Sequence, residues 1–188
     1  MESNSAEVSV SQNANEGEVK ERSQEQYDYV YCTVCYNDQP LRAKHCKQCG
    51  TCIAMFDHHC PFVDNCIGEK NKLIFFFYIF FQCLECILTC WLLINTTEDQ
   101  NDFKSFWTLN YPYILASFFP FLIGTLLLFL WIYHLVLACK GVTTFEMIKW
   151  KDIHYLGALK ASPFSKGVWK NLVYFFKPFK GVTLWRVQ

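Results

Sequence analysis

The residues with the most chemistry to offer are cysteines and histidines gathered in one short window of the chain. Seven of the eleven cysteines and three of the five histidines fall between positions 31 and 66. Two Cys-x2-Cys pairs stand out, a recurrent zinc-binding spacing, because thiolate sulfur and imidazole nitrogen are ligands that Zn²⁺ prefers. The potential ligands are Cys32, Cys35, His45, Cys46, Cys49, Cys52, His58, His59, Cys60 and Cys66.

This set of ten exceeds the needs of two closed tetrahedral zinc sites by two ligands, and the count leaves open which two. A thiol without a metal ion is a potential nucleophile, and a free imidazole is a potential general base. The run Asp57-His58-His59-Cys60 supplies both groups, with a carboxylate to orient a histidine. The alternative for His58 and Cys60 is zinc ligation or a structural role, and for Asp57 the capping of a turn.

The segment that positions these residues, 29–72, contains two prolines and two glycines and shows no sustained helical or strand periodicity. We therefore expect short hairpins and turns that are held by metal ions, since no apolar core is evident. Residues 1–28 are polar and mostly acidic. They are expected to form a disordered tail and not a signal peptide, because they lack an apolar run and bury too little surface.

Two long apolar stretches follow, residues 73–94 with one charged side chain, Glu85, and residues 114–138 with no Asp, Glu, Lys or Arg. Each exceeds the roughly 20 apolar residues that a helix needs to cross a bilayer. The sequence predicts two transmembrane helices joined by a loop over 95–113. A buried helical pair in a soluble protein is the weaker alternative, because a chain of 188 residues is too small to cover both stretches. His134 and Glu85 fall at different depths, so no pairing between them is expected.

The charges balance at 17 basic and 17 acidic side chains, which gives no argument for a nucleic-acid partner. Their distribution is informative: the 95–113 loop is mostly acidic, whereas lysines flank the other ends of both helices. By the positive-inside bias, the cysteine-rich segment and residues 139–188 are predicted to be cytosolic and the loop lumenal. The cytosol keeps thiols reduced and available to metal.

These features closely resemble the DHHC-type protein S-acyltransferases, also called palmitoyltransferases. The run Asp-His-His-Cys-Pro at positions 57–61 lies in a similar cysteine-rich frame. Thr-Thr-Phe-Glu at 143–146 matches the family's Thr-Thr-x-Glu motif, and Pro-Phe-x2-Gly-x3-Asn at 163–171 matches its C-terminal motif. The resemblance covers roughly residues 30–176. Family members usually have four membrane helices, with the zinc-bound segment between the second and the third, and this sequence shows the later pair.

The resemblance implies two structural zinc ions, each with four protein ligands and no open position for water. The first would be held by Cys32, Cys35, His45 and Cys52, and the second by Cys46, Cys49, His59 and Cys66. The two ligands left over would then be Cys60 and His58.

The resemblance also implies the remaining roles: Cys60 as nucleophile, His58 as general base and Asp57 as the residue that orients it. Thr144 is expected to hydrogen-bond the Asp57 carboxylate, with Glu146 and Asn171 in supporting roles. Asn171 would brace a helix end and the aromatic segment beside it. The plain alternative for the threonines at 143 and 144 is that they cap a helix.

The implied activity is transfer of a long-chain acyl group from acyl-CoA, such as palmitoyl-CoA, to cysteines of membrane-associated client proteins through an acyl-Cys60 intermediate. The family implies a multi-pass protein of the Golgi or endoplasmic reticulum, embedded in the lipid bilayer, with a homo- or hetero-oligomer as an open alternative. The alternative function is a noncatalytic zinc-bearing membrane adaptor or a truncated, inactive family member. Residues 169–180 interleave aromatics with lysines and predict a segment at the membrane interface.

Overall fold

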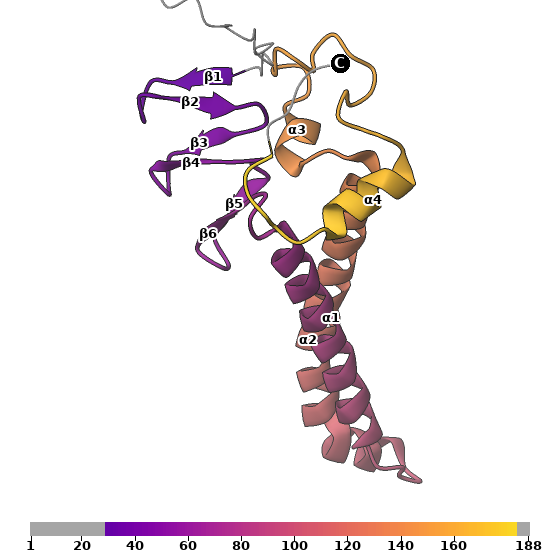
Figure 1. The fold of residues 1–188 in the computed structure, drawn as a ribbon. Helices are drawn as coiled ribbons and strands as arrows, with labels where there is room; N and C mark the ends of the chain where they lie inside the picture. Colours follow the sequence, from indigo (N-terminus) through magenta and orange to yellow (C-terminus); the bar gives the residue numbers. More distant parts are fainter. Residues whose placement is uncertain (1–28, 184–188) are drawn as a thin grey trace, which may run out of the picture.

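The computed structural model describes residues 29–183, so the tail predicted over 1–28 lies outside the described residues. The strands pair as three antiparallel hairpins: β1 (Tyr29–Cys32) with β2 (Asn37–Pro40), β3 (Lys44–Cys46) with β4 (Thr51–Ile53), and β5 (His58–Cys60) with β6 (Asn65–Ile67). The helices are α1 (Lys72–Asn95), α2 (Phe103–Lys140), α3 (Thr144–Ile148) and α4 (Val168–Phe176). The predicted class, a cysteine-rich hairpin domain with two long apolar helices, is confirmed (Figure 1).

The hairpins place potential metal ligands side by side. In the second hairpin His45 lies opposite Cys52, and in the third His59 lies opposite Cys66. Directly opposed residues of an antiparallel pair point to the same face, so each hairpin presents two ligand side chains together. Strands of three or four residues are marginal as isolated hairpins in water. A further cross-link between the hairpins is therefore needed for order.

Helices α1 and α2 lie side by side as an antiparallel pair beneath the hairpins (Figure 1). They lie close together at Gly124, where an added Cβ would lie only 2.9 Å from the Cβ of Cys86. The Cys83 thiol lies 3.6 Å from the carbonyl oxygen of Gly124. Small residues at the contact allow the two backbones to approach, as is common between membrane helices.

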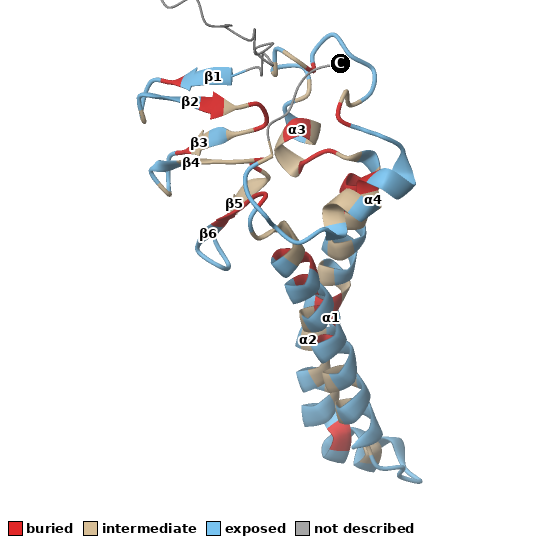
Figure 2. Cartoon of the chain, in the orientation of Figure 1, coloured by how far each residue is buried: buried red, intermediate tan, exposed pale blue. Residues whose placement is uncertain are grey.

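Most of this helix pair is exposed (Figure 2), and the two helices are strongly apolar. In the most apolar 18-residue stretch of each helix, only 28% is buried in α1 and 22% in α2. Trp91 and Phe129 are examples of large apolar side chains that are exposed. A core helix of a soluble protein would be mostly covered. Length, composition and exposure together indicate two membrane-spanning helices.

The second long helix begins at Phe103, whereas the sequence analysis expected a loop up to residue 113. The Asp102 carboxylate accepts a hydrogen bond from the backbone N–H of Ser105 at 3.0 Å, which caps this helix start. The side chain of Asn110 is fully buried and bonds both the N–H and the carbonyl of Glu98, at 2.9 and 2.8 Å. The loop was predicted because these residues are polar and interrupt the apolar stretch. The helix nevertheless begins here, because a cap and side-chain contacts with the backbone stabilise its first turns.

The third hairpin is fixed to the top of the helix pair by an apolar contact. Cys60 of β5 and Ile67 of β6 pack on Phe75 and Ile79 of α1. This cluster is closed by Leu127 and Trp131 of α2. The cysteine of the Asp-His-His-Cys run therefore lies where the hairpin domain meets the helices.

Candidate active site

The structure groups eight of the ten potential ligands into two compact clusters. The donor atoms of each cluster lie within 4.8 Å of one another. The first contains Cys32, Cys35, His45 and Cys52, and the second contains Cys46, Cys49, His59 and Cys66. These are the two groups that the family resemblance implied.

Short donor-to-donor distances support each cluster. In the first, Cys35 Sγ lies 3.2 Å from His45 Nδ1. In the second, Cys49 Sγ lies 3.3 Å from Cys66 Sγ and 3.4 Å from His59 Nδ1. Three thiols and one imidazole in a compact group fit a tetrahedral structural Zn²⁺ site, which would join neighbouring hairpins and supply the missing cross-link.

Cys60 belongs to neither cluster. Its side chain is 6% exposed and packs in the apolar contact between the third hairpin and α1. Cys60, which the resemblance implies to be the free thiol, thus lies at the junction of the cysteine-rich domain and the helix pair.

Asp57 and His58 form a close pair just before this cysteine. His58 Nδ1 lies 2.7 Å from Asp57 Oδ2, and the other carboxylate oxygen accepts the backbone N–H of Thr144 at 2.6 Å. Burial by itself raises the pKa of the Asp57 carboxyl, but the hydrogen bonds from His58 and Thr144 outweigh it and lower that pKa. The carboxylate is therefore kept ionised next to the imidazole.

The environment of His58 favours a proton on its ring. Burial acts to lower the pKa of the imidazole, whereas the hydrogen bond to Asp57, the charge of that carboxylate and the interaction with Cys60 raise it, and the net shift is upward. A carboxylate on Nδ1 holds the tautomer in which Nε2 is free to accept a proton. This arrangement suits a general base.

The two threonines of the Thr-Thr-x-Glu motif have different roles: Thr143 caps a helix and Thr144 contacts Asp57. Thr143 caps α3: its hydroxyl accepts the N–H of Glu146 at 3.2 Å, and the Glu146 carboxylate accepts the N–H of Thr143 at 2.9 Å. Thr144 contacts Asp57 through its backbone N–H, and its buried hydroxyl has no hydrogen-bond partner among the described residues. The hydrogen bond of 2.6 Å that the Asp57 carboxylate accepts from Thr144 therefore comes from the backbone.

Glu146 is held by an arginine that the sequence analysis did not single out. Arg42 Nε and Nη2 each lie 2.7 Å from one oxygen of the Glu146 carboxylate, and Nη2 also donates to the carbonyl of Gly141 at 3.1 Å. The guanidinium lies 4.6 Å from the ring centroid of Phe164. These contacts fasten the hairpin domain to α3 and to the end of α2.

Asn171 ties the C-terminal motif to the end of α2. Its side-chain amide donates to the carbonyl of Cys139 and to the Ser165 hydroxyl, both at 2.8 Å, and its oxygen accepts the N–H of Lys166 at 2.9 Å. The brace at a helix end, which the resemblance implied, is present in this form. The same helix α4 exposes Trp169 and Val173, as expected for a segment at the membrane interface.

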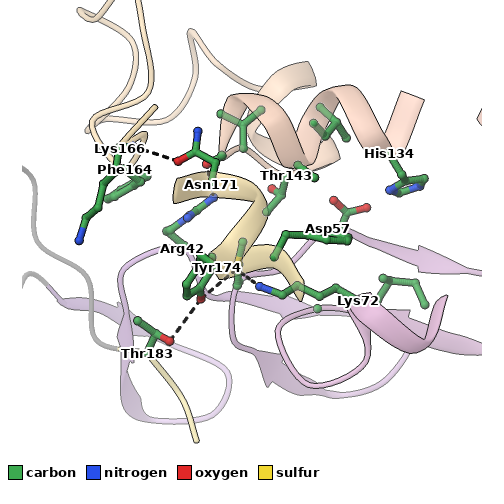
Figure 3. A pocket seen from close by; sticks show the side chains of 18 of the residues that line it. Arg42, Asp57, Lys72, His134, Thr143, Phe164, Lys166, Asn171, Tyr174 and Thr183 are labelled. Carbon is green, nitrogen blue, oxygen red and sulfur yellow. Dashed lines mark hydrogen bonds between the residues drawn. The ribbon is translucent and has the colours of Figure 1, made fainter. Parts of the chain in front are cut away.

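A cavity of about 360 Å³ opens between the third hairpin, the end of α2 and α4 (Figure 3). Asp57 and His134 lie on one side of it and Lys166 and Asn171 on the other (Figure 3). Asp57 is the only acidic residue of the lining, while the basic residues are Arg42, Lys72, Lys166 and Lys170. The cavity thus joins the Asp57 carboxylate to a cationic surface.

His134 has no role predicted from the sequence, yet it lies beside the Asp57–His58 pair in the structure. A ring nitrogen of His134, a ring nitrogen of His58 and a carboxylate oxygen of Asp57 all lie within 4.8 Å of one another. No local signal in the sequence could have found this, because α2 and the third hairpin meet only in the folded chain. The one hint was a histidine inside an apolar stretch.

The structure thus combines a pair of apolar helices, two Cys/His clusters, and a cysteine outside both clusters near an Asp–His pair. A family model described as DHHC palmitoyltransferase matches residues 25–151. The chain therefore belongs to the DHHC palmitoyltransferase family.

Curated relatives carry matching names. The chain is 31% identical over 168 residues to Palmitoyltransferase ZDHHC17 of Mus musculus, covering 79% of this chain and 26% of that protein. It is 34% identical over 143 residues to Protein S-acyltransferase 10 of Arabidopsis thaliana, covering 75% of this chain and 41% of that protein. With Palmitoyltransferase ZDHHC2 of Danio rerio it shares 33% identity over 148 residues, covering 75% of this chain and 39% of the relative. The chain thus spans well under half the length of these relatives.

Proposed function

We propose that this chain is a protein-cysteine S-acyltransferase that forms an acyl-Cys60 intermediate from a long-chain acyl-CoA and passes the acyl group to a client cysteine. The observation that carries the proposal is the Asp57–His58 hydrogen bond of 2.7 Å, which is formed two residues before Cys60, a cysteine outside both metal clusters. A noncatalytic adaptor would need the metal ligands alone. It would have no use for an oriented base beside a free thiol.

The first half-reaction uses these three side chains in order. A free thiol has a pKa near 8.5 and is only a few per cent ionised at neutral pH, so His58 takes the proton of Cys60 as the thiol attacks. The new bond joins Cys60 Sγ to the acyl carbonyl carbon, and the carbon–sulfur bond to coenzyme A breaks. The departing thiolate receives the proton from the imidazolium, whose charge Asp57 stabilises.

The second half-reaction reverses these steps with a different thiol. The client cysteine loses its proton to His58 and attacks the acyl-Cys60 carbonyl, and Cys60 leaves as a thiolate that regains a proton. One thioester is exchanged for another in each step, so the protein contributes mainly positioning and exclusion of water.

The metal clusters act on structure in this scheme. Zn²⁺ at the two Cys/His clusters would hold the three hairpins in register, and no ligand position is left open for chemistry. Ordering of the hairpins is what places Asp57, His58 and Cys60 on the helix pair.

The surroundings of the site support the proposed substrates. The phosphates of coenzyme A are anionic and complement Lys72, Lys166 and Lys170 around the cavity. The exposed apolar helices offer a lipid-like path for the acyl chain. We propose that the hairpin domain lies on the cytosolic side of a Golgi or endoplasmic reticulum membrane. There it would face membrane-associated clients whose cytosolic cysteines are reduced. Further helices from a homo- or hetero-oligomer would extend that path.

Covalent labelling tests the proposal. The full chain, purified in detergent, is incubated with an alkynyl palmitoyl-CoA, and the label is located by mass spectrometry. We expect label on Cys60 that hydroxylamine releases, and none on this peptide in Cys60→Ser. Cys139→Ser is the matched control, since this cysteine lies at the end of α2 outside both clusters and should not affect labelling. Wild-type protein that binds two zinc ions and never acquires label would support the adaptor function instead.

A further inference from the structure

His134 completes a group of three rings around the site. This side chain lies on α2, is 7% exposed, and its ring centroid is 6.0 Å from that of His58. Phe75 of α1 stands at 5.4 Å from each of the two histidine rings, edge to face in both cases. The His58 ring is therefore bounded by one ring from each long helix.

These contacts restrict a side chain that would otherwise be free to turn. The terminal torsion of a histidine is broad, so a single hydrogen bond does not fix which nitrogen faces its partner. The His58 side chain is 30% exposed, which leaves room for rotation on its open side. A half-turn of the ring would take Nδ1 away from Asp57.

The ring of His134 is available for such a role. Among residues 29–183 its ring packs against the rings of His58, Phe75 and Tyr133, and one of its nitrogens lies within 4.8 Å of an Asp57 carboxylate oxygen. Its position at the edge of the cavity, next to Asp57, is visible in Figure 3.

We propose that His134 is a positioning residue that, together with Phe75, clamps the His58 ring in the orientation bonded to Asp57. The proposal rests on the proposed acyl transfer, in which His58 must present Nε2 to Cys60. Because His134 belongs to α2 and Phe75 to α1, the clamp also makes the orientation of the base depend on the packing of the two long helices.

The main test compares the rate of acyl-Cys60 formation in wild type, His134→Ala, His58→Ala and the double variant. Misplacement of a reacting group by about 1 Å costs on the order of 100-fold in rate. We expect His134→Ala to lower the rate at saturating acyl-CoA by roughly 10- to 100-fold with little change in KM. In the His58→Ala background the same substitution should have no further effect, because no base is left to orient.

Three controls isolate positioning from folding. His134→Phe keeps a ring of similar shape and should retain activity within about threefold, since the clamp needs ring contact and not a nitrogen. Ile132→Ala, on the same helix and 43% exposed, should behave as wild type. All variants should keep two zinc ions per chain.

Several outcomes would overturn the clamp: a wild-type rate in His134→Ala, an equal loss in the His58→Ala background, loss of zinc, or a His134→Phe protein as slow as His134→Ala.

Alkylation of Cys60 by iodoacetamide, followed by mass spectrometry, gives a readout without acyl-CoA. If wild type forms no acyl-Cys60, the proposed function fails. Slower alkylation in His134→Ala than in wild type would still support the clamp, and equal rates would refute it.

Discussion

Arg42 and Glu146 are 104 residues apart in the sequence and meet in a buried ion pair with two hydrogen bonds of 2.7 Å. The side chains are 1% and 2% exposed. Arg42 precedes the second hairpin. Glu146 lies in α3, two residues after Thr144, whose backbone N–H binds Asp57 at the start of this helix. This pair therefore connects the metal-binding hairpins to the backbone that positions the proposed catalytic carboxylate.

Arg42→Ala is expected to destabilise the fold strongly. It leaves the Glu146 carboxylate buried without its charged partner, and breaking such a pair typically costs about 3–5 kcal/mol. Thermal unfolding of the detergent-purified protein should show this loss. Lys149→Ala is the matched control: its pair with Asp152 is exposed and should be worth less than about 1 kcal/mol. Equal losses in the two variants would contradict a structural role for the buried pair.

Thr144→Pro and Thr144→Ala are expected to differ in acylation rate. Thr144 is the first residue of α3, a position that tolerates proline, and Thr143 before it is already extended. Thr144→Pro removes the N–H that binds Asp57 together with the threonine side chain, so comparison with Thr144→Ala isolates the contribution of the N–H. We expect a fall of roughly tenfold in acyl-Cys60 formation with the helix retained, part of the 100-fold or more typical of general base catalysis.

Thr144→Ala keeps that N–H and removes a buried hydroxyl without a described partner. Its acylation rate should stay near wild type, and its stability should not fall, because no hydrogen bond is lost. The measurement is single-turnover labelling with an alkynyl acyl-CoA, beside thermal unfolding. A Thr144→Ala protein as slow as Thr144→Pro would show that the side chain holds the site after all.

Zinc content should respond to the clusters one at a time. Cys32→Ser is expected to lower the bound metal from two ions to one, and Cys66→Ser to do the same through the other cluster. Cys60→Ser should retain both ions, since its sulfur lies outside the clusters. Metal per chain is measured by inductively coupled plasma mass spectrometry on purified protein. A loss of zinc in Cys60→Ser would undermine its assignment as the free thiol.

Asn171→Ala should loosen the contact between α4 and the end of α2. It removes two donors, to Cys139 and Ser165, and the acceptor for the Lys166 N–H, and buried groups left unpaired cost about 1–3 kcal/mol each. We expect a lower unfolding temperature and faster amide hydrogen exchange at residues 138–141. Val173→Ala, on the exposed face of α4, should leave both unchanged.

Much of the architecture was predictable because it depends on local chemistry. Two apolar stretches have to be helical in a membrane, where each backbone polar group needs an internal partner. The helix start at Phe103 was not predicted, because the cap at Asp102 and the buried Asn110 are polar features that a search for apolar runs passes over.

Residue types and their spacing specify the chemistry open to this chain: ten potential metal ligands where two tetrahedral sites need eight, a carboxylate and an imidazole close to a thiol, and two apolar stretches long enough to cross a bilayer. Which atoms meet depends on the folded arrangement. Arg42 contacts Glu146, the backbone N–H of Thr144 contacts Asp57, and His134 packs beside His58. Residue type and spacing govern what a side chain can do, but contacts between distant segments arise from the packing of whole elements, which no local pattern specifies.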